Sequence, residues 1–403
     1  MAKPFINAAD KTSADAAHLL MRLGLILGFV ITPIVLLTSQ RAIFILSPIA
    51  ATLILSAGAM LSPRVMRIAA PFSFLASPVG LGAVFLSIWA VASLTWTPFP
   101  SEAAPRLFKI VSTFLLVLPV ASVLPVRSRP ANLYVLPLGV AAASFGAIAL
   151  NFATPAAKHD VAMNETLARA VTVLLLLAWP ATLAAILRGR PAMAASVAIV
   201  VAAAAVAVHA TTASFAALAA GAAFLAAKAD KTSTASWIGR IGAASFIAAP
   251  CLPLLLGPWI GDSSGNLAWL HAWRDTIMAD GVRLLTGHGF NYVASGSSQG
   301  YLGALTPKTV LFEIWTDLGI LGALAGAALL AWAYQLAGRQ SPKAAPYWIG
   351  ALTFVTAFAV FGGGALQLGW ITAQALALVA LILATRGEFQ TARPTAPRHH
   401  VPS

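Results

Sequence analysis

The chain has 403 residues, of which 59% are hydrophobic and only 9% are charged, and its mean hydropathy is +0.85. A soluble domain usually carries about 25% charged residues, so this composition excludes an ordinary soluble protein and indicates one that crosses a membrane several times. The formal net charge is +13, and the single cysteine, Cys251, excludes an intramolecular disulfide and a cysteine-based metal site.

Apolar stretches long enough to cross a bilayer recur along the whole sequence. Twelve spans are predicted, near residues 19–38, 42–61, 79–95, 107–125, 132–152, 168–187, 191–209, 211–228, 237–256, 310–337, 346–363 and 367–385. We therefore predict an all-α polytopic membrane protein. Nine spans lie in residues 1–256 and three in 310–385, separated by a large loop at 257–309 and followed by a polar tail at 386–403. No cleavable signal peptide is expected, because the first apolar stretch is long enough to span.

Basic residues concentrate in alternate connecting segments. With the N-terminus placed in the cytoplasm, 17 of the 25 basic residues and 4 of the 12 acidic residues lie in the predicted inner segments. This is the bias that the positive-inside rule describes, and it places both termini in the cytoplasm. The net charge of +13 therefore reports topology, so it is no evidence for a nucleic-acid partner.

Eight basic residues remain on the predicted outer side, against the usual bias. They are Arg41, Arg106, Lys109, Lys158, Arg169, Arg274, Arg283 and Lys308. Taken singly, each is best interpreted as snorkelling to the interface or pairing locally, as Arg169 would with Glu165 four positions earlier. Taken together, several lie at the mouths of spans, where ionisable groups often mark a substrate path. The set favours an anionic ligand at the outer surface.

The loop at 257–309 has its own predicted structure. Apolar residues at helical spacing within 267–290, among them Trp273 and Ile277, predict an amphipathic helix on the membrane surface. Arg274 would lie on a different face of this helix. The Gly-His-Gly sequence at 287–289 should end it, and the small polar residues of 291–305 predict a mobile cover over a site.

The start of the tenth span carries the next signal. Thr306 is a good N-cap and Pro307 suits a first helical position, so the helix is predicted to begin there. Lys308 in the first turn opposes the helix dipole unless an anion is near. With Arg274 and the free backbone N–H groups, it would form a phosphate or pyrophosphate site. A lysine that snorkels to lipid headgroups explains Lys308 equally well.

Two acidic residues follow in the same span. Glu313 and Asp317 are four positions apart and therefore share one helix face. They would suit the helix dipole, bind a cation, or pair with Arg106 or Arg169. The sequence leaves these three interpretations open.

The loop and tenth span together resemble the signature of the O-antigen ligase and polymerase superfamily of bacterial envelopes. The likeness lies in LLTGHGF and TPKTVLFEIWTDLGILGAL, where Gly319 and Gly322 occupy the two glycine positions of the signature. The run at 312–315 matches its apolar–acid–apolar pattern. The family also places an amphipathic helix bearing arginine in a long periplasmic loop before the motif, as Arg274 would be here. Residues 164–180 resemble the family's sixth span.

The resemblance implies a GT-C-like glycosyltransferase in the bacterial inner membrane, with its active face in the periplasm. It would move a glycan from undecaprenyl pyrophosphate to a sugar hydroxyl on lipid A core or on a growing polysaccharide, by inversion and without metal or cofactor. Arg274, Arg169 and Arg106 would bind the pyrophosphate. Glu313, Thr309, Gly319 and Gly322 would support the site.

One position departs from the family pattern. The family's catalytic histidine falls on Lys308, and its Asn, Ser or Gln position falls on Thr309. The ordinary pKa of lysine is about 10.4, so Lys308 would need nearby cations and partial burial to act as a base. Alternatively, it would stay charged and bind phosphate. His288 is the nearest histidine in sequence and the candidate substitute.

Other outer-side groups are weaker candidates. His271 on the surface helix is expected to be interfacial. His159 and Asp160 share another predicted outer loop, and their role stays open.

Two other functions remain. The chain would bind lipid-linked glycan or assist its assembly without catalysis, because lysine occupies the base position. Alternatively, it would be a polyisoprenoid-lipid flippase or transporter. A transporter is expected to have ionisable residues near the membrane midplane. Here these residues cluster instead at the predicted outer ends of the spans.

Overall fold

The computed structural model describes residues 8–61, 74–124, 130–153, 161–256, 268–303, 305–307, 309–362 and 368–386. Every regular element in these residues is a helix, so the prediction of an all-α chain is confirmed. The first third contains α1 (Ala8–Ile26), the π-helical turn η1 (Leu27–Ile31), α2 (Thr32–Val35), α3 (Ala42–Leu61), α5 (Pro78–Ser93) and α6 (Pro100–Val123).

The remaining helices follow in chain order. The middle of the chain forms α7 (Pro130–Ala153), α8 (Val161–Leu187), α9 (Pro191–Ala207), α10 (Thr211–Ala229), α11 (Lys231–Ala248) and α12 (Cys251–Leu256). The predicted loop contributes α13 (Ala268–Ala279), α14 (Arg283–Thr286) and α15 (Tyr292–Ser298). The last three are α16 (Val310–Gly338), α17 (Ala345–Phe361) and α18 (Leu368–Arg386).

The apolar helices make this a multi-pass membrane protein. Eight helices in the described part of the chain are long and apolar enough to cross a membrane, and α5, α9 and α17 are shorter apolar helices at three further predicted spans. The predicted ninth span, 237–256, differs, because the helix breaks at Pro250 and resumes as α12. A proline cannot donate the helical hydrogen bond at that point. The count of twelve spans stays a prediction.

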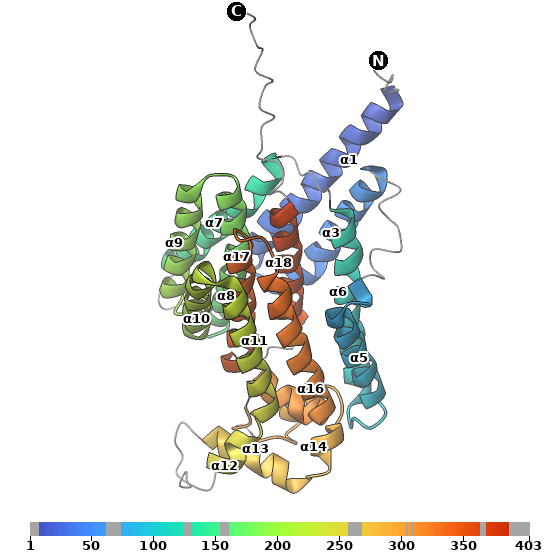
Figure 1. The fold of residues 1–403 in the computed structure, drawn as a ribbon. Coiled ribbons are helices and arrows are strands. Elements are labelled where there is room, and N and C mark those ends of the chain that lie inside the picture. The colour runs from blue at the N-terminus through green and yellow to red at the C-terminus, as the bar shows by residue number, and fades with distance from the viewer. Residues whose placement is uncertain are drawn as a thin grey trace, which may run out of the picture.

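The connections that the charge pattern assigns to one side do lie together. The Arg386 guanidinium at the end of α18 donates to the carbonyl of Leu124 at the end of α6. The Lys231 ammonium at the start of α11 donates to the carbonyl of Gln340 after α16. Helices α12 to α14 gather at the opposite end of the bundle from the start of α1 (Figure 1). This opposite end is called the loop end below.

The helices are unequally enclosed. Of the apolar stretch of α8, 72% is buried inside the bundle, whereas only 17% is buried in α6. Leu174 and Leu176 of α8 belong to the main apolar core, which also takes side chains from α1, α3, α7 and α18. Helix α6 is therefore a peripheral element, attached to the bundle mainly through α3 and α18.

The start of α16 differs from the predicted one. The helix begins at Val310, and its N-cap is Thr309, whose hydroxyl accepts a hydrogen bond from the N–H of Phe312 at 3.3 Å. Thr306 instead donates its hydroxyl to the carbonyl of Gly303 at 2.7 Å. The predicted start at Thr306 is therefore wrong by about one turn, because a second threonine offers the same capping chemistry.

Candidate functional site

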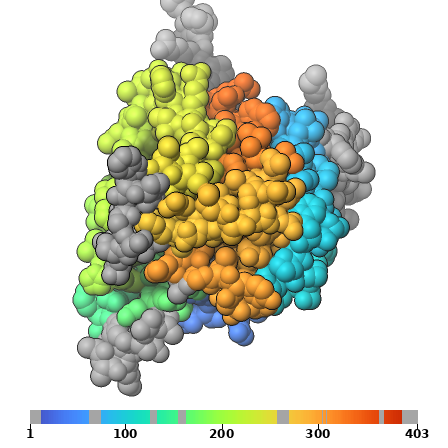
Figure 2. Space-filling view, turned by 90° about the horizontal axis from the view of Figure 1, so that it is seen from below, coloured from blue at the N-terminus to red at the C-terminus, as the bar shows by residue number. Residues whose placement is uncertain are grey.

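The amphipathic helix predicted within 267–290 is confirmed in its first part as α13, which ends at Ala279 and not at 287–289. Its apolar face is buried against α16, where the Trp273 and Phe312 rings meet edge to face with centroids 5.5 Å apart, and Ile277 joins the same apolar cluster. Arg274 is half-buried on another face. The described residues supply no hydrogen bond or ion pair to its guanidinium. The loop helices spread over the loop end and adjoin the cyan elements of α5 and α6 (Figure 2).

Helix α16 is broken at Gly319. This residue has φ 67° and ψ −161°, which are non-helical values. The break leaves three carbonyls of the preceding turn without their usual helical partners. The loop and α5 provide substitutes: the His288 N–H donates to Thr316 O at 2.8 Å and the Gly289 N–H to Asp317 O at 2.9 Å. The indole N–H of Trp89 donates to Leu318 O at 2.9 Å.

Glycine is required where the loop backbone meets this break. A Cβ on Gly319 would lie 2.5 Å from the Leu285 carbonyl oxygen, and a Cβ on Gly287 would lie 2.2 Å from the Asp317 carbonyl oxygen. Both residues also have positive φ, where side chains other than glycine are strained. One turn later, a Cβ on Gly322 would lie 2.3 Å from the Leu318 Cβ. The two glycines of the sequence signature thus have a steric reason in this chain.

Asp317 anchors the segment that follows the glycines. Its side chain is only 3% exposed, and its two oxygens accept hydrogen bonds from the N–H of Asn291 and the N–H of Val293, each at 2.9 Å. These N–H groups belong to the start of α15. Within the predicted mobile cover at 291–305, residues 292–298 therefore form a short helix that a buried carboxylate anchors, and the mobility of the cover stays a prediction.

A polar network continues from α15 to α6. Arg106 donates to the side-chain oxygen of Asn291 and also interacts electrostatically with Asp317. Asn291 donates to Ser295 Oγ at 2.7 Å, and Ser295 donates in turn to Glu102. Of the three predicted partners for the acidic face of α16, the structure supports Arg106.

Glu102, Asn291 and Ser295 were missed in the sequence. One signal for Glu102 was available in the sequence. Glu102 lies one helical turn before Arg106, near a predicted span mouth, and side chains at this spacing share one helix face. The 2.9 Å hydrogen bond from Gln299 to Glu102 has no comparable signal, because it joins segments nearly two hundred residues apart. Pairings of this kind depend on the tertiary fold.

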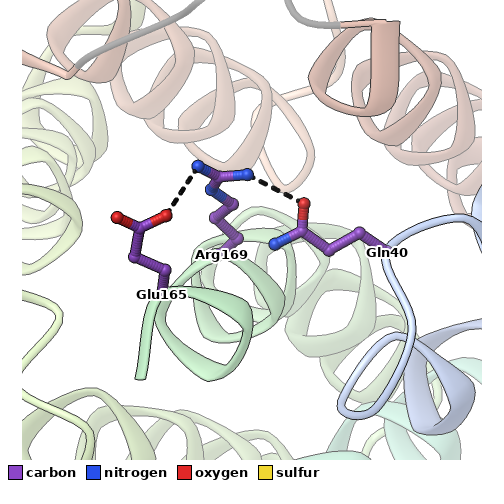
Figure 3. Close-up of polar contacts among 3 residues, drawn as sticks. All are labelled: Gln40, Glu165 and Arg169. Atoms are coloured by element: carbon purple, nitrogen blue, oxygen red, sulfur yellow. Dashed lines mark hydrogen bonds and ion pairs between the residues drawn. The ribbon is translucent and has the colours of Figure 1, made fainter. Parts of the chain in front are cut away.

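Arg169 lies in a different polar group. Its guanidinium donates to Gln40 Oε1 at 2.9 Å and to Glu165 Oε2 at 3.0 Å (Figure 3). The predicted local pair with Glu165 is thereby confirmed. Both side chains are about half exposed, so this ion pair is worth less than about 1 kcal/mol. A role for Arg169 in binding pyrophosphate stays a prediction.

His288 has a defined orientation beside the break in α16. Its Nδ1 lies 3.2 Å from the Thr316 carbonyl oxygen, and a carbonyl can only accept. Nδ1 therefore carries the proton, and Nε2 is the basic nitrogen. The ring stacks on Tyr292 with centroids 4.5 Å apart. Burial lowers the pKa of His288 below its ordinary value, and the nearby Arg283 adds to this effect.

The remaining predicted residues are placed as follows. Lys308, His159 and Asp160 lie outside the described residues. Glu313 is 5% exposed on the same face of α16 as Asp317. The Nε2 atom of His271 is buried without a hydrogen-bond partner. Among the residues that the structure describes, no group of three or more metal-ligating side chains comes together.

Comparison with known proteins leaves the family open. No family model matches the sequence, and no curated protein matches it.

Proposed function

We propose that the chain is a glycosyltransferase of the O-antigen ligase and polymerase type, with a GT-C-like fold and its active face at the loop end, on the periplasmic side of the bacterial inner membrane. It moves a glycan from undecaprenyl pyrophosphate to a sugar hydroxyl on lipid A core or on a growing polysaccharide. The observation that carries the proposal is Arg274. It is a cation without a described counter-ion, on a helix whose apolar side chains pack against α16.

The proposed reaction is a single inverting displacement. A base removes the proton of the acceptor hydroxyl, the hydroxyl oxygen bonds to the anomeric carbon, and the bond from that carbon to the pyrophosphate breaks with its electron pair. Arginines stabilise the charge that develops on the leaving pyrophosphate. Arg274 has this role, with Arg106 and Arg169 as further binding residues. Because Arg106 already contacts Asn291, Arg274 has the charge most available to a ligand.

Two residues are candidates for the base. Lys308 occupies the family's histidine position, and His288 presents a basic Nε2 because its Nδ1 faces the Thr316 carbonyl. A neutral histidine accepts a proton without further perturbation, whereas a lysine must first lose one. We therefore favour His288 as the base and Lys308 as a phosphate-binding cation. Thr309, Glu313, Gly319 and Gly322 support the site by shaping the start of α16.

The pH dependence of transfer separates the two bases. The lowered pKa of His288 means that the ring stays neutral down to below about pH 6.5. With His288 as the base, transfer should be constant near neutral pH and fall as the pH drops through that lowered pKa. His288→Gln should lose most of the transfer activity, and its remaining rate should no longer fall at acidic pH. A rate that instead climbs steadily above neutral pH, and does so in both proteins, would assign the base to Lys308.

Replacing Arg274 by alanine should reduce glycan transfer about 10²-fold or more, as loss of one charge-stabilising donor does elsewhere. The measurement is the envelope polysaccharide of a deletion strain that carries the variant, with membrane protein levels checked in parallel. Arg240→Ala is the matched control, since Arg240 is an exposed arginine on α11, outside the loop. Wild-type polysaccharide in the Arg274→Ala strain would remove Arg274 from the site.

A binding protein without catalysis is the second candidate, because lysine stands at the family's base position. It would hold lipid-linked glycan at the same loop end and hand it to another enzyme. In that case Lys308→Ala and His288→Gln would leave polysaccharide attachment and chain length unchanged in the deletion strain. Loss of either feature in one of the two variants favours the transferase.

A further inference from the structure

A cavity lies within the bundle, away from the loop. It is an apolar groove of about 630 Å³ between α1, α3, α6 and α18. Small residues on the inner helices, such as Gly28 and Ala51, leave this space open, and the peripheral position of α6 keeps it unfilled. None of its lining residues belongs to the loop helices α13 to α15.

The groove opens sideways toward lipid. Phe108 lines it and is 73% exposed, and it lies in α6, which is apolar enough to cross a membrane. An apolar side chain exposed on such a helix faces hydrocarbon. The groove is therefore accessible to apolar chains from the bilayer.

The polar groups in the groove indicate a charged end to the ligand. Lys109 is the one charged residue among the described residues that line it, and its ammonium has no hydrogen bond or ion pair with the described chain. Ser47 also lines the groove, and its hydroxyl is buried without a hydrogen-bond partner. A lysine in a membrane span is costly unless an anion or water meets it. The groove thus combines an apolar slot with a cation at one end.

The length of the slot matches one leaflet of a bilayer. The lining of α6 runs from Phe108 to Val120, which corresponds to about 18 Å of helix at about 1.5 Å per residue. Half of a hydrocarbon core of about 30 Å is about 15 Å. A fatty acyl chain anchored at the interface has this reach, whereas a polyisoprenyl chain of many units is much longer than one leaflet.

We propose that this groove binds one acyl chain of an anionic phospholipid from the leaflet at the loop end, with the lipid phosphate on Lys109. The bound chain fills the space between α6 and the bundle. It thereby holds in place the helix that carries Glu102 and Arg106 to α15. The inference does not rest on the proposed transferase activity, because a lipid site would exist with or without glycan transfer.

Photo-crosslinking and native mass spectrometry of the full chain in phosphatidylcholine nanodiscs test this proposal. The probe is phosphatidylglycerol with a photoreactive acyl chain. We expect crosslinks to residues of α3, α6 and α18, and retention of one phosphatidylglycerol after purification. Lys109→Gln should weaken retention about fivefold, the effect of one basic residue near an anionic lipid. Ser112→Trp should exclude the chain by filling the groove.

The matched controls are Lys343→Gln, an exposed lysine in the connection before α17, and Phe114→Trp, on α6 but outside the groove lining. Neither should change retention. Equal capture of a photoreactive phosphatidylcholine, or unchanged retention in Lys109→Gln, would overturn the charge recognition. Displacement of phosphatidylglycerol by an equimolar polyisoprenyl phosphate would overturn the choice of occupant.

Discussion

Replacing Gly319 by alanine is expected to destabilise the protein by about 3 kcal/mol and to detach the loop from α16. The backbone at Gly319 has φ 67°, a conformation that costs other residues about 1–3 kcal/mol. The added Cβ would also meet the Leu285 carbonyl at 2.5 Å. Thermal unfolding in detergent measures the stability, and limited proteolysis at 280–305 measures detachment of the loop.

Gly221→Ala is the matched control for this substitution. Gly221 lies inside α10, and nothing lies within 4 Å of a Cβ placed on it. Alanine is the better helix former by about 1 kcal/mol, so this variant should be as stable as the parent or slightly more so. If Gly319→Ala behaves like Gly221→Ala, α16 is continuous and the break has no role.

Replacing Asp317 by asparagine should have a similarly large effect, about 3 kcal/mol, because it leaves a buried backbone N–H without an acceptor. The carboxylate accepts hydrogen bonds from two backbone N–H groups at the start of α15. An amide offers one oxygen, so one of these N–H groups would face another donor.

The effect should be local as well as large. Hydrogen exchange in residues 291–298 should rise in Asp317→Asn, while α8 in the core stays protected. Asp275→Asn, an exposed position on α13, should leave both unchanged. Unaltered protection of α15 in Asp317→Asn would show that the carboxylate is not its anchor.

The parts of the loop that the sequence predicted correctly depend on local spacing. Trp273 and Ile277 are four residues apart, and that spacing places them on one face of any helix. The Glu165–Arg169 pair likewise needed only its spacing. The predicted helix end at 287–289 was wrong for the amphipathic helix, because α13 already ends at Ala279 and Gly287 follows the separate short helix α14.

The missed features depend on contacts between distant segments. The stretch 310–337 is predominantly apolar, and a glycine inside such a stretch does not by itself signal a break. Gly319 adopts its conformation because the loop backbone approaches it. The small polar residues of α15 favour a loop locally, but the carboxylate of Asp317 caps them as a helix. Thr306 and Thr309 can both cap a helix, so the preference for threonine at this position did not identify which of them is the N-cap of α16.

Release of undecaprenyl pyrophosphate by the purified protein is the decisive measurement for the proposed function. Proteoliposomes containing the full chain, a lipid-linked glycan donor and an acceptor glycan should release the carrier pyrophosphate in step with the glycosylated product, without added metal or nucleotide. The Arg274→Ala protein should release about 10²-fold less, and Arg240→Ala should match the parent. Donor that binds to the protein but yields no carrier pyrophosphate and no product, over many hours and with every acceptor tested, would contradict the transferase.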